Sequence, residues 1–278
     1  MPNKNVPIAI VYDFDGTLAP GNLQENSFIP DVGMRPGKFW KEVNQRAKDI
    51  QADPILMYMR LMLEKAKAAG IPVRLGDFKK RGEGIEFFNG VYDWFDQIND
   101  YGKSKGVKVE HYVVSSGNAE IIEGTVIARK FTKIYASRFM FDEHNAAFWP
   151  ALAVNFTTKT QFLFRINKGA HDLSDASRVN KFVEQSQRPI PFENMVYIGD
   201  GETDVPCFRL IKDLGGLAVV VYKPHTKNAR VEAERFIKEG RVHCAASADY
   251  SEDKELERIV KARIDIVAAY GNFNRMFG

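Results

Sequence analysis

The feature that most constrains the fold is a set of short apolar segments without the polar alternation of a half-exposed strand. These segments are rich in Val and Ile and cover residues 8–12, 109–114, 195–198 and 217–222. Strands that are apolar on both faces are typical of a parallel sheet covered by helices on both sides. Helical patterns separate them at residues 119–130, 175–187 and 203–214. The sequence therefore predicts an α/β core built on a parallel sheet.

Further elements complete this core. Residues 241–246 form a weaker strand pattern, and residues 252–269 have the spacing of an amphipathic helix. Residues 139–156 predict a hairpin with its turn at "DEHN".

The segment between the first two strands has a different character. It contains "GKFWKEVNQRAKDI" and "DPILMYMRLMLEKAKAAG", both with helical periodicity, and Asp53 and Pro54 stand where a helix cap and first turn are expected. We therefore predict a mostly helical domain at residues 20–89, inserted into a core made of residues 1–19 and 90–278. Its methionines, Met57, Met59 and Met62, are interpreted as the interior of this domain, the alternative being an adaptable surface for a substrate.

Composition excludes several classes of protein. The chain has 39 basic and 36 acidic residues, a balance that predicts neither nucleic acid nor an anionic membrane as partner and leaves a small anionic molecule open. No segment reaches about 18 apolar residues, and the first apolar run is too short for a signal peptide, so a cytoplasmic protein is expected. Cys207 and Cys244 lack metal-binding spacing and are expected to be reduced core thiols.

Acidic residues follow two of the predicted strands. Asp13 and Asp15 end the first, and "YIGDGETD" places Asp200 at the end of another, with Asp204 one helical turn later. A third strand ends in "VVSSGN", which contains Ser115. Each motif alone could be a turn or a helix cap. Because the carboxyl ends of parallel strands meet at one edge of a sheet, their joint occurrence predicts a single ligand site.

Such a cluster of carboxylates needs a counter-charge. Two carboxylates about 4 Å apart repel by roughly 4 kcal/mol at an effective dielectric constant near 20. Oxygen ligands with no His or Cys nearby favour Mg²⁺, which proteins commonly hold through one or two carboxylates and a substrate phosphate. We therefore expect the first strand to deliver Asp13 and Asp15 to Mg²⁺ and to the phosphate of a small phosphorylated metabolite.

These motifs resemble those of the haloacid dehalogenase superfamily of phosphohydrolases, in particular its phosphoserine phosphatase-like branch. The matching pieces are "DFDGTL", "VVSSGN", a lysine near "TTKTQ" and "GDGETD", and the stretches "IIEGTVIARKFTKIYASRF" and "VVVYKP" strengthen the likeness. The resemblance implies a Rossmann-like core, and it implies that the helical insertion is the element that the family calls a C1 cap.

The resemblance also implies roles for the acidic residues. Asp13 is then the nucleophile that forms an aspartyl phosphate, and Asp15 the general acid and base. Mg²⁺ is expected on the Asp13 carboxylate, the Asp15 backbone carbonyl and Asp200, with Asp204 as a ligand or one step further out. The implied activity is that of a Mg²⁺-dependent phosphomonoesterase.

The remaining site residues follow from the same resemblance. Ser115 is expected to donate to the phosphate, assisted by the backbone of the residues around it. The expected phosphate-binding set is Gly16, Thr17, Ser116, Gly117 and Asn118. For the lysine of the third motif we favour Lys159, which opens an apolar helical stretch, over Lys168, which precedes a glycine at an expected helix end.

The chain departs from its branch around the substrate. Phosphoserine phosphatases usually have a glutamate soon after the first motif, to meet the substrate's amino group; here Ala19, Pro20, Gly21 and Asn22 follow, and Glu25 stands further on. Other candidates for contact with a substrate are His225 and the basic residues Arg35, Arg60, Arg74, Lys79, Lys80 and Arg81. Two alternative functions stay open, a phosphotransferase or mutase and a regulator that binds a phosphorylated metabolite without turnover.

Overall fold

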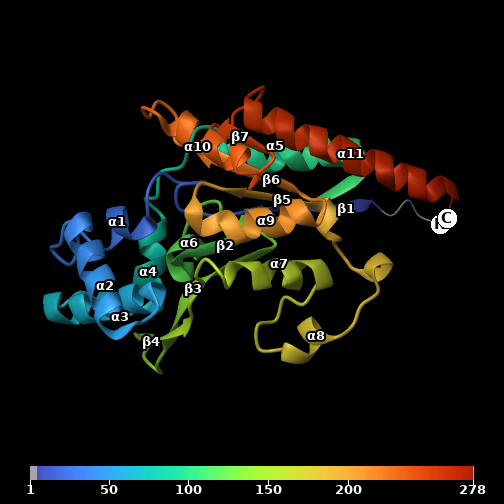
Figure 1. The fold of residues 1–278 in the computed structure, drawn as a ribbon. Coiled ribbons are helices and arrows are strands. Elements are labelled where there is room, and N and C mark those ends of the chain that lie inside the picture. Colours follow the sequence, from blue (N-terminus) through green and yellow to red (C-terminus); the bar gives the residue numbers. More distant parts are fainter. Residues whose placement is uncertain (1–4, 278) are drawn as a thin grey trace.

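The computed structural model describes residues 5–277, and its centre is a seven-stranded sheet (Figure 1). The strand order is β4-β3-β2-β1-β5-β6-β7, with every neighbouring pair parallel except β3 and β4. The strands are β1 (Val6–Tyr12), β2 (Val107–Asn118), β3 (Lys133–Phe141), β4 (Ala147–Leu152), β5 (Met195–Gly199), β6 (Leu217–Tyr222) and β7 (Cys244–Ser247). The predicted Rossmann-like α/β core is confirmed.

Helices cover the sheet on both faces. In Figure 1, α5 (Val91–Ser104) and α11 (Glu255–Phe277) lie above the sheet, and α7 (Lys159–Lys168) and α9 (Val205–Asp213) lie below it. The helix α10 (Ala229–Lys238) packs into the same apolar cluster as α7 and α9. Successive residues of β1 enter opposite clusters, Ile8 and Ile10 that of α5 and α11, Ala9 and Val11 that of α7 and α9. This burial of both faces explains why the strand patterns carry no polar alternation.

The segment between β1 and α5 is helical. It contains α1 (Leu23–Ser27), α2 (Pro36–Ile50), α3 (Pro54–Ala69) and α4 (Leu75–Gly82), seen at the left of Figure 1. The side chain of Asp53 caps α3 by accepting from Ile55 N at 2.7 Å and Leu56 N at 3.2 Å. The three methionines of α3 are buried, as their interpretation as interior residues predicts. Phe28, Phe39 and Phe78 join the apolar cluster that also contains β1 and α5.

Two predicted helices are much shorter than their sequence patterns. The predicted helix at 119–130 is α6 (Ala119–Glu123), followed by a 3₁₀ turn at Ala128–Lys130. It is interrupted at Gly124, where a Cβ atom would come within 1.9 Å of the Lys79 carbonyl oxygen of α4. Glycine, which also ends helices readily, lets the backbone of α4 approach closely at this position. The helix predicted at 175–187 was also too long: only α8 (Ala176–Asn180) and a 3₁₀ turn at Gln185–Gln187 form there.

The bounds of the other elements differ less from the predicted ones. The predicted hairpin is β3 and β4, but β3 also pairs in parallel with β2 and so belongs to the central sheet. The last strand is shorter than predicted, and the last helix extends to Phe277. Both cysteines are free, Cys207 buried and Cys244 half-buried, which agrees with the expected core thiols.

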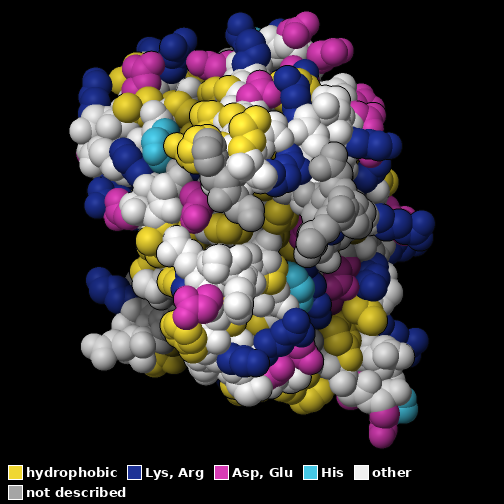
Figure 2. All heavy atoms as spheres, turned by 90° about the vertical axis from the view of Figure 1, so that its right-hand side faces the viewer, with side chains coloured by type: hydrophobic (Ala, Val, Ile, Leu, Met, Phe, Trp, Pro, Cys, Tyr) yellow, Lys and Arg dark blue, Asp and Glu magenta, His cyan; other side chains and the backbone are white. Residues whose placement is uncertain are grey.

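The surface and the helices give two further observations. On the face in Figure 2, Lys and Arg side chains lie interspersed with Asp and Glu side chains, as the near balance of charges in the sequence leads one to expect. Across residues 5–277, no helix combines the length and hydropathy needed to cross a bilayer.

A buried network of hydrogen bonds joins the first two strands, β1 and β2, to α5. Trp94 Nε1 donates to the Tyr12 hydroxyl at 2.7 Å, that hydroxyl lies 2.9 Å from His111 Nδ1, and His111 Nε2 lies 3.2 Å from Asn99 Oδ1. All these bonds are satisfied if His111 is neutral with its proton on Nε2. Burial lowers the pKa of His111 to about 3, and the charge of Asp96 only partly opposes this shift.

This histidine makes stability depend on pH. Because its folded pKa lies below the unfolded value near 6.5, the unfolded state binds the extra proton, and stability falls as pH drops from about 6.5 toward 3. We expect wild type to lose roughly 1.4 kcal/mol more per pH unit in this window than His111→Gln, which cannot titrate. Urea unfolding at pH 7, 6 and 5 measures the difference. His144→Gln, an exposed control, should match wild type, and parallel curves for His111→Gln and wild type would contradict the assignment.

Candidate active site

The strand register brings three segments to one edge of the sheet. Tyr12, the last residue of β1, is paired with Val113 of β2 and with Ile198 of β5. Asp13 N then donates to the Ile198 carbonyl at 2.9 Å. Ser115 and Asp200 follow these partners by two residues on either side of β1. The chain leaves β1 toward β2 and returns to its other side at β5, so this is the switch point where α/β sheets bind ligands.

A cavity of about 1020 Å³ opens at this edge. The core lines it with Asp13, Asp15, Ser115 and Asp200, together with the backbone of Gly16. The helical segment at residues 20–89 contributes the opposite wall, which includes side chains from α1, α2 and α3. The space is far larger than a phosphate group and has room for a substrate of metabolite size.

A buried lysine joins two of the predicted acidic residues. Lys159 is fully buried at the start of α7, and its Nζ lies 2.7 Å from Asp13 Oδ2 and 2.8 Å from Asp204 Oδ1. Burial opposes its charge, but the two carboxylates outweigh burial and raise the pKa of Lys159 above its usual value. Lys168 instead donates to the carbonyls of Val179 and Lys181. Of the two candidate lysines, Lys159 is the one at the site.

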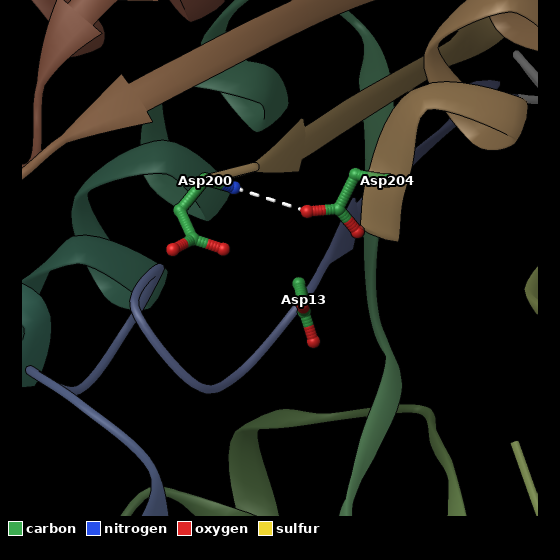
Figure 3. A group of neighbouring side chains, drawn as sticks. All are labelled: Asp13, Asp200 and Asp204. Carbon is green, nitrogen blue, oxygen red and sulfur yellow. Dashed lines mark hydrogen bonds between the residues drawn. The ribbon is translucent and has the colours of Figure 1, made fainter. Parts of the chain in front are cut away.

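Asp204 is held by protein donors on both oxygens. Besides Lys159, the Tyr197 hydroxyl donates to Oδ1 at 2.7 Å, and the backbone N–H groups of Asp200 and Gly201 donate to Oδ2 at 3.1 Å and 3.3 Å. Figure 3 shows the bond from Asp200 N. Because four donors bond to it, Asp204 holds the Lys159 side chain and the loop after β5 in place. The expectation that it is a direct metal ligand is therefore not supported by this geometry.

Asp200 is the carboxylate without a partner. Ligand oxygens of Asp13, Asp200 and Asp204 lie within 4.8 Å of one another, and Figure 3 shows the Asp200 carboxylate on the loop that faces Asp13. In the described chain no hydrogen bond or ion pair reaches the Asp200 side chain. Partial loss of hydration, followed by repulsion from the charges of Asp204 and Asp13, raises the pKa of Asp200 to about 8.

These residues fit a Mg²⁺ ion. The donors are all oxygen, and the Asp200 carboxylate is free to bind, which is the chemistry that Mg²⁺ requires. The loop after β1 approaches closely, since a Cβ atom on Gly16 would lie 2.1 Å from Asp200 Oδ2. Gly16 has φ of +74°, so glycine suits this position both by space and by backbone conformation.

Asp15 lies beside Asp13 on the cavity wall. Its Oδ1 accepts from Leu23 N of α1 at 2.9 Å, and its Oδ2 lies against Gly117, where a Cβ atom would come within 2.8 Å. Burial, followed by the charge of Asp13, raises the pKa of Asp15 to about 8. In the metal-free chain, this carboxyl can therefore hold a proton at neutral pH.

The end of β2 forms the third part of the wall. Ser115 is buried and lines the cavity, and its Oγ accepts from Gly117 N at 3.1 Å, so the hydroxyl proton is free to donate. The strand register shifts between Ser115 and Asn118, which makes the intervening residues bulge. The Ser116 carbonyl on this bulge accepts from the Tyr58 hydroxyl of α3 at 2.8 Å.

Three predicted phosphate-binding residues do not line the cavity. Thr17 is fully buried, and its carbonyl accepts from Tyr250. Gly117 lies behind Asp15, where it makes room for that carboxylate. Asn118 caps α6, with its Oδ1 accepting from Ile121 N at 3.0 Å. Thr17 Oγ1 is buried without a hydrogen bond in the described chain. The expected contacts of these three residues with a phosphate stay predictions.

The basic residues proposed for substrate binding also lie elsewhere. Arg60 bonds Glu64, and Arg81 bonds Asp31. Neither His225 nor any of the six candidates lines the cavity: Arg35, Arg60, Arg74, Lys79, Lys80 and Arg81. Arg81 is largely buried and packs over the rings of Phe28 and Phe78.

The sequence analysis missed several residues of the site. Tyr197 appeared only as a member of an apolar strand, although a tyrosine in a fully buried strand needs a hydrogen-bond partner. Trp40, Tyr58 and Gln24 reach the cavity from the helical segment. Their helical spacing shows that they share faces of α1, α2 and α3, but it does not show which faces meet the core.

Comparison with known proteins identifies the family. The model of the family described as "haloacid dehalogenase-like hydrolase" matches residues 10–209, which include all four motifs. The chain belongs to this family.

Individual proteins are similar to the chain over most of its length. An uncharacterized protein of Borreliella burgdorferi is 28% identical over 292 residues, which cover 92% of this chain and 96% of that protein. The fold is similar to a substrate-bound phosphoserine phosphatase complex, at 15% identity and a TM-score of 0.56, over 92% of this chain and 98% of that one. A phospho-aspartyl intermediate analogue of phosphoserine phosphatase matches at 17% identity and a TM-score of 0.55, over 92% and 99%.

Proposed function

We propose that this hydrolase is a Mg²⁺-dependent phosphatase that cleaves a small phosphomonoester through an aspartyl phosphate on Asp13. The observation that carries the proposal is the pair Asp13 and Asp15 on one cavity wall, with the buried Lys159 ammonium 2.7 Å from Asp13. The folds of the two phosphoserine phosphatase structures, one of them titled a phospho-aspartyl intermediate analogue, support it.

In the first step, an Asp13 carboxylate oxygen attacks phosphorus and the bond from phosphorus to the alcohol oxygen breaks. Asp15 gives its proton to the departing alkoxide, so that the alcohol leaves neutral. Lys159 orients Asp13 and offsets its charge, and Ser115 donates to a phosphate oxygen. Asp13 needs positioning more than activation, because a carboxylate is already ionised when it is paired with an ammonium.

In the second step, water attacks the phosphorus of the aspartyl phosphate. Asp15, now ionised, accepts a proton from this water, and the bond to Asp13 breaks to release inorganic phosphate. Both steps use the same two carboxylates, which explains why one residue separates them at the end of a rigid strand.

The metal site follows from the same residues. We propose that the Asp13 and Asp200 carboxylates and the Asp15 backbone carbonyl hold Mg²⁺, while Asp204 fixes Lys159. When bound, the ion neutralises phosphate charge and aligns the group for transfer.

We further propose that residues 20–89 act as a cap domain on the core formed by residues 1–19 and 90–278. Two bonds join α3 to the core beside the cavity: Tyr58 to the Ser116 carbonyl at 2.8 Å, and Asn155 Nδ2 to Asp53 Oδ2 at 2.6 Å. Closure of this wall over the substrate would exclude bulk water during transfer.

The proposal is tested by release of phosphate from 4-nitrophenyl phosphate with Mg²⁺ and with a chelator. Turnover that requires Mg²⁺ supports it, and its absence for this and other small phosphate esters rejects it. Addition of alcohols and a search for phosphorylated products separates a transferase from a phosphatase. The presence of both Asp13 and Asp15 argues against a regulator without turnover.

Mg²⁺ should also stabilise the fold measurably. In its absence, the Asp200 carboxylate has no partner and lies near two others, so Mg²⁺ should raise Tm by binding the folded state, with a gain of about 2.7 kcal/mol at one hundred times Kd. Asp200→Asn removes this ligand and should lose most of the Mg²⁺-induced rise, while the metal-free Tm at pH 7 should stay close to that of wild type, because a carboxyl with a pKa of about 8 is mostly protonated there. Thermal unfolding measures both. An equal Mg²⁺ effect in wild type and variant would show that the ion binds elsewhere.

A further inference from the structure

The wall that faces the phosphate site carries no charge. Within the described chain, every side chain that lines the cavity from residues 20–89 is neutral, and the set includes Gln24, Trp40, Asn44, Ile55 and Tyr58. Glu25, the first acidic residue after Asp15 in the sequence, does not line the cavity. Its carboxylate accepts from Asn22 Nδ2 and Trp40 Nε1, each at 2.7 Å. A substrate that reaches this wall therefore finds no fixed counter-charge on it.

One polar group on this wall lacks a partner. Gln24 lies at the start of α1, is 1% exposed, and has a buried Oε1 atom without a hydrogen bond in the protein. Gln24 also lines the cavity, so a rotation of its terminal amide toward a bound ligand would complete its bonding. A buried amide oxygen left unpaired costs free energy, so a donor that reaches it from the substrate is favoured.

The chemistry of the wall selects a hydroxyl as that donor. A hydroxyl both donates and accepts, so it suits either orientation of the Gln24 amide. A substrate ammonium would lose water without gaining a carboxylate, and a substrate carboxylate would find no cation on this wall. On the core side, the cavity is also lined by exposed charged residues of both signs outside the acidic centre, namely Glu202, Lys223, Glu232 and Arg235. Of these, Arg235 forms an ion pair with Glu202.

Two aromatic rings complete the wall. Trp40 and Tyr58 meet edge to face, with ring centroids 5.7 Å apart. Their polar atoms are already bonded, Trp40 Nε1 to Glu25 and Tyr58 Oη to the Ser116 carbonyl, so both offer ring surface to the cavity. Apolar ring surface beside neutral amides suits a carbon skeleton that bears hydroxyls.

We infer that the substrate is the phosphate ester of an uncharged polyhydroxy alcohol, as in a polyol or sugar phosphate, and that Gln24 recognises one of its hydroxyls. This inference rests on the proposed phosphatase function. It assigns to the cap wall a selectivity against amino acid phosphates, since neither the ammonium nor the carboxylate of such a substrate finds a partner there.

The test compares three esters of similar size: glycerol 3-phosphate, O-phosphoserine and n-propyl phosphate. In wild type with Mg²⁺, kcat/KM for glycerol 3-phosphate should exceed that for each of the others about tenfold or more. In Gln24→Met, which keeps the length of the side chain and removes its amide, the ratio of kcat/KM for glycerol 3-phosphate to that for n-propyl phosphate should fall about tenfold. Gln45→Met, on the exposed face of α2, is the matched control and should keep the wild-type ratio.

The outcomes separate this inference from the proposed function. No turnover of 4-nitrophenyl phosphate or of any ester rejects the phosphatase itself. Turnover with phosphoserine equal to or better than glycerol 3-phosphate overturns the inference and leaves the phosphatase standing, as does an unchanged ratio in folded Gln24→Met. The comparison in wild type decides the question even if the variant does not fold.

Discussion

Replacement of Asp13 by Asn should reduce phosphate release at least about 10⁴-fold, the largest effect of any single substitution in the chain. The amide has nearly the shape of the carboxylate but is a far weaker nucleophile, so no aspartyl phosphate can form. The fold should persist, because the amide keeps the size of the carboxylate, its single oxygen can still accept from Phe14 N, and Lys159 keeps its bond to Asp204. Initial rates with 4-nitrophenyl phosphate and Mg²⁺ measure the effect, and circular dichroism checks the fold.

Asp49→Asn is the matched control for this substitution. Asp49 is exposed on α2 and accepts from Gln45, so its replacement should leave the rate within about twofold of wild type. A second measurement tests the intermediate: after a short reaction with substrate, acid-quenched wild type should carry phosphate on Asp13, and the variant should carry none. Full activity in Asp13→Asn would mean that another residue attacks phosphorus.

The strands of the sheet and the location of the site could be predicted because they depend on local patterns. Buried parallel strands are apolar along their length, so their ends are visible in the sequence, and the residues after them must gather at one edge of the sheet. Asp13, Ser115 and Asp200 were placed correctly for this reason.

What could not be predicted depends on contacts between distant segments. The helix after Asn118 ends at Gly124, a helix-stop signal that the predicted span of 119–130 overlooked, but the close approach of the α4 backbone to this glycine is not visible in the sequence. The sequence favoured Lys159 over Lys168 for the third motif, and the structure agrees, since the two lysines occupy opposite ends of α7 and Lys159 is the one that meets Asp13.

The motifs alone also did not predict which hydrogen bonds their polar residues make. Asn118 and Thr17 stand in the motifs beside phosphate-binding residues, yet one caps a helix and the other is buried behind the loop. Asp204 looks like a fourth ligand, but its four donors make it an anchor for Lys159. A motif fixes which residues are near the site, whereas hydrogen-bond partners decide which of them face the ligand.

The second large effect is expected at Lys159. Lys159→Met removes the cation between two buried carboxylates, so Asp13 and Asp204 are left to repel each other without a counter-charge between them. Loss of one partner of a buried ion pair typically costs about 3–5 kcal/mol, and we expect that decrease in the free energy of unfolding. Phosphate release should fall at least about 100-fold, because Asp13 loses its orientation and the phosphate a nearby positive charge. Urea unfolding and initial rates measure the two effects.

The double variant Lys159→Met with Asp204→Asn separates the structural from the catalytic part. Removal of the second charge relieves the repulsion, so part of the lost stability should return, whereas activity should stay low because the ammonium beside Asp13 is still missing. Lys168→Met at the other end of α7 loses only bonds to backbone carbonyls and should retain activity. A Lys159→Met protein as stable and as active as wild type would show that the buried cation neither holds the acidic centre together nor takes part in phosphoryl transfer.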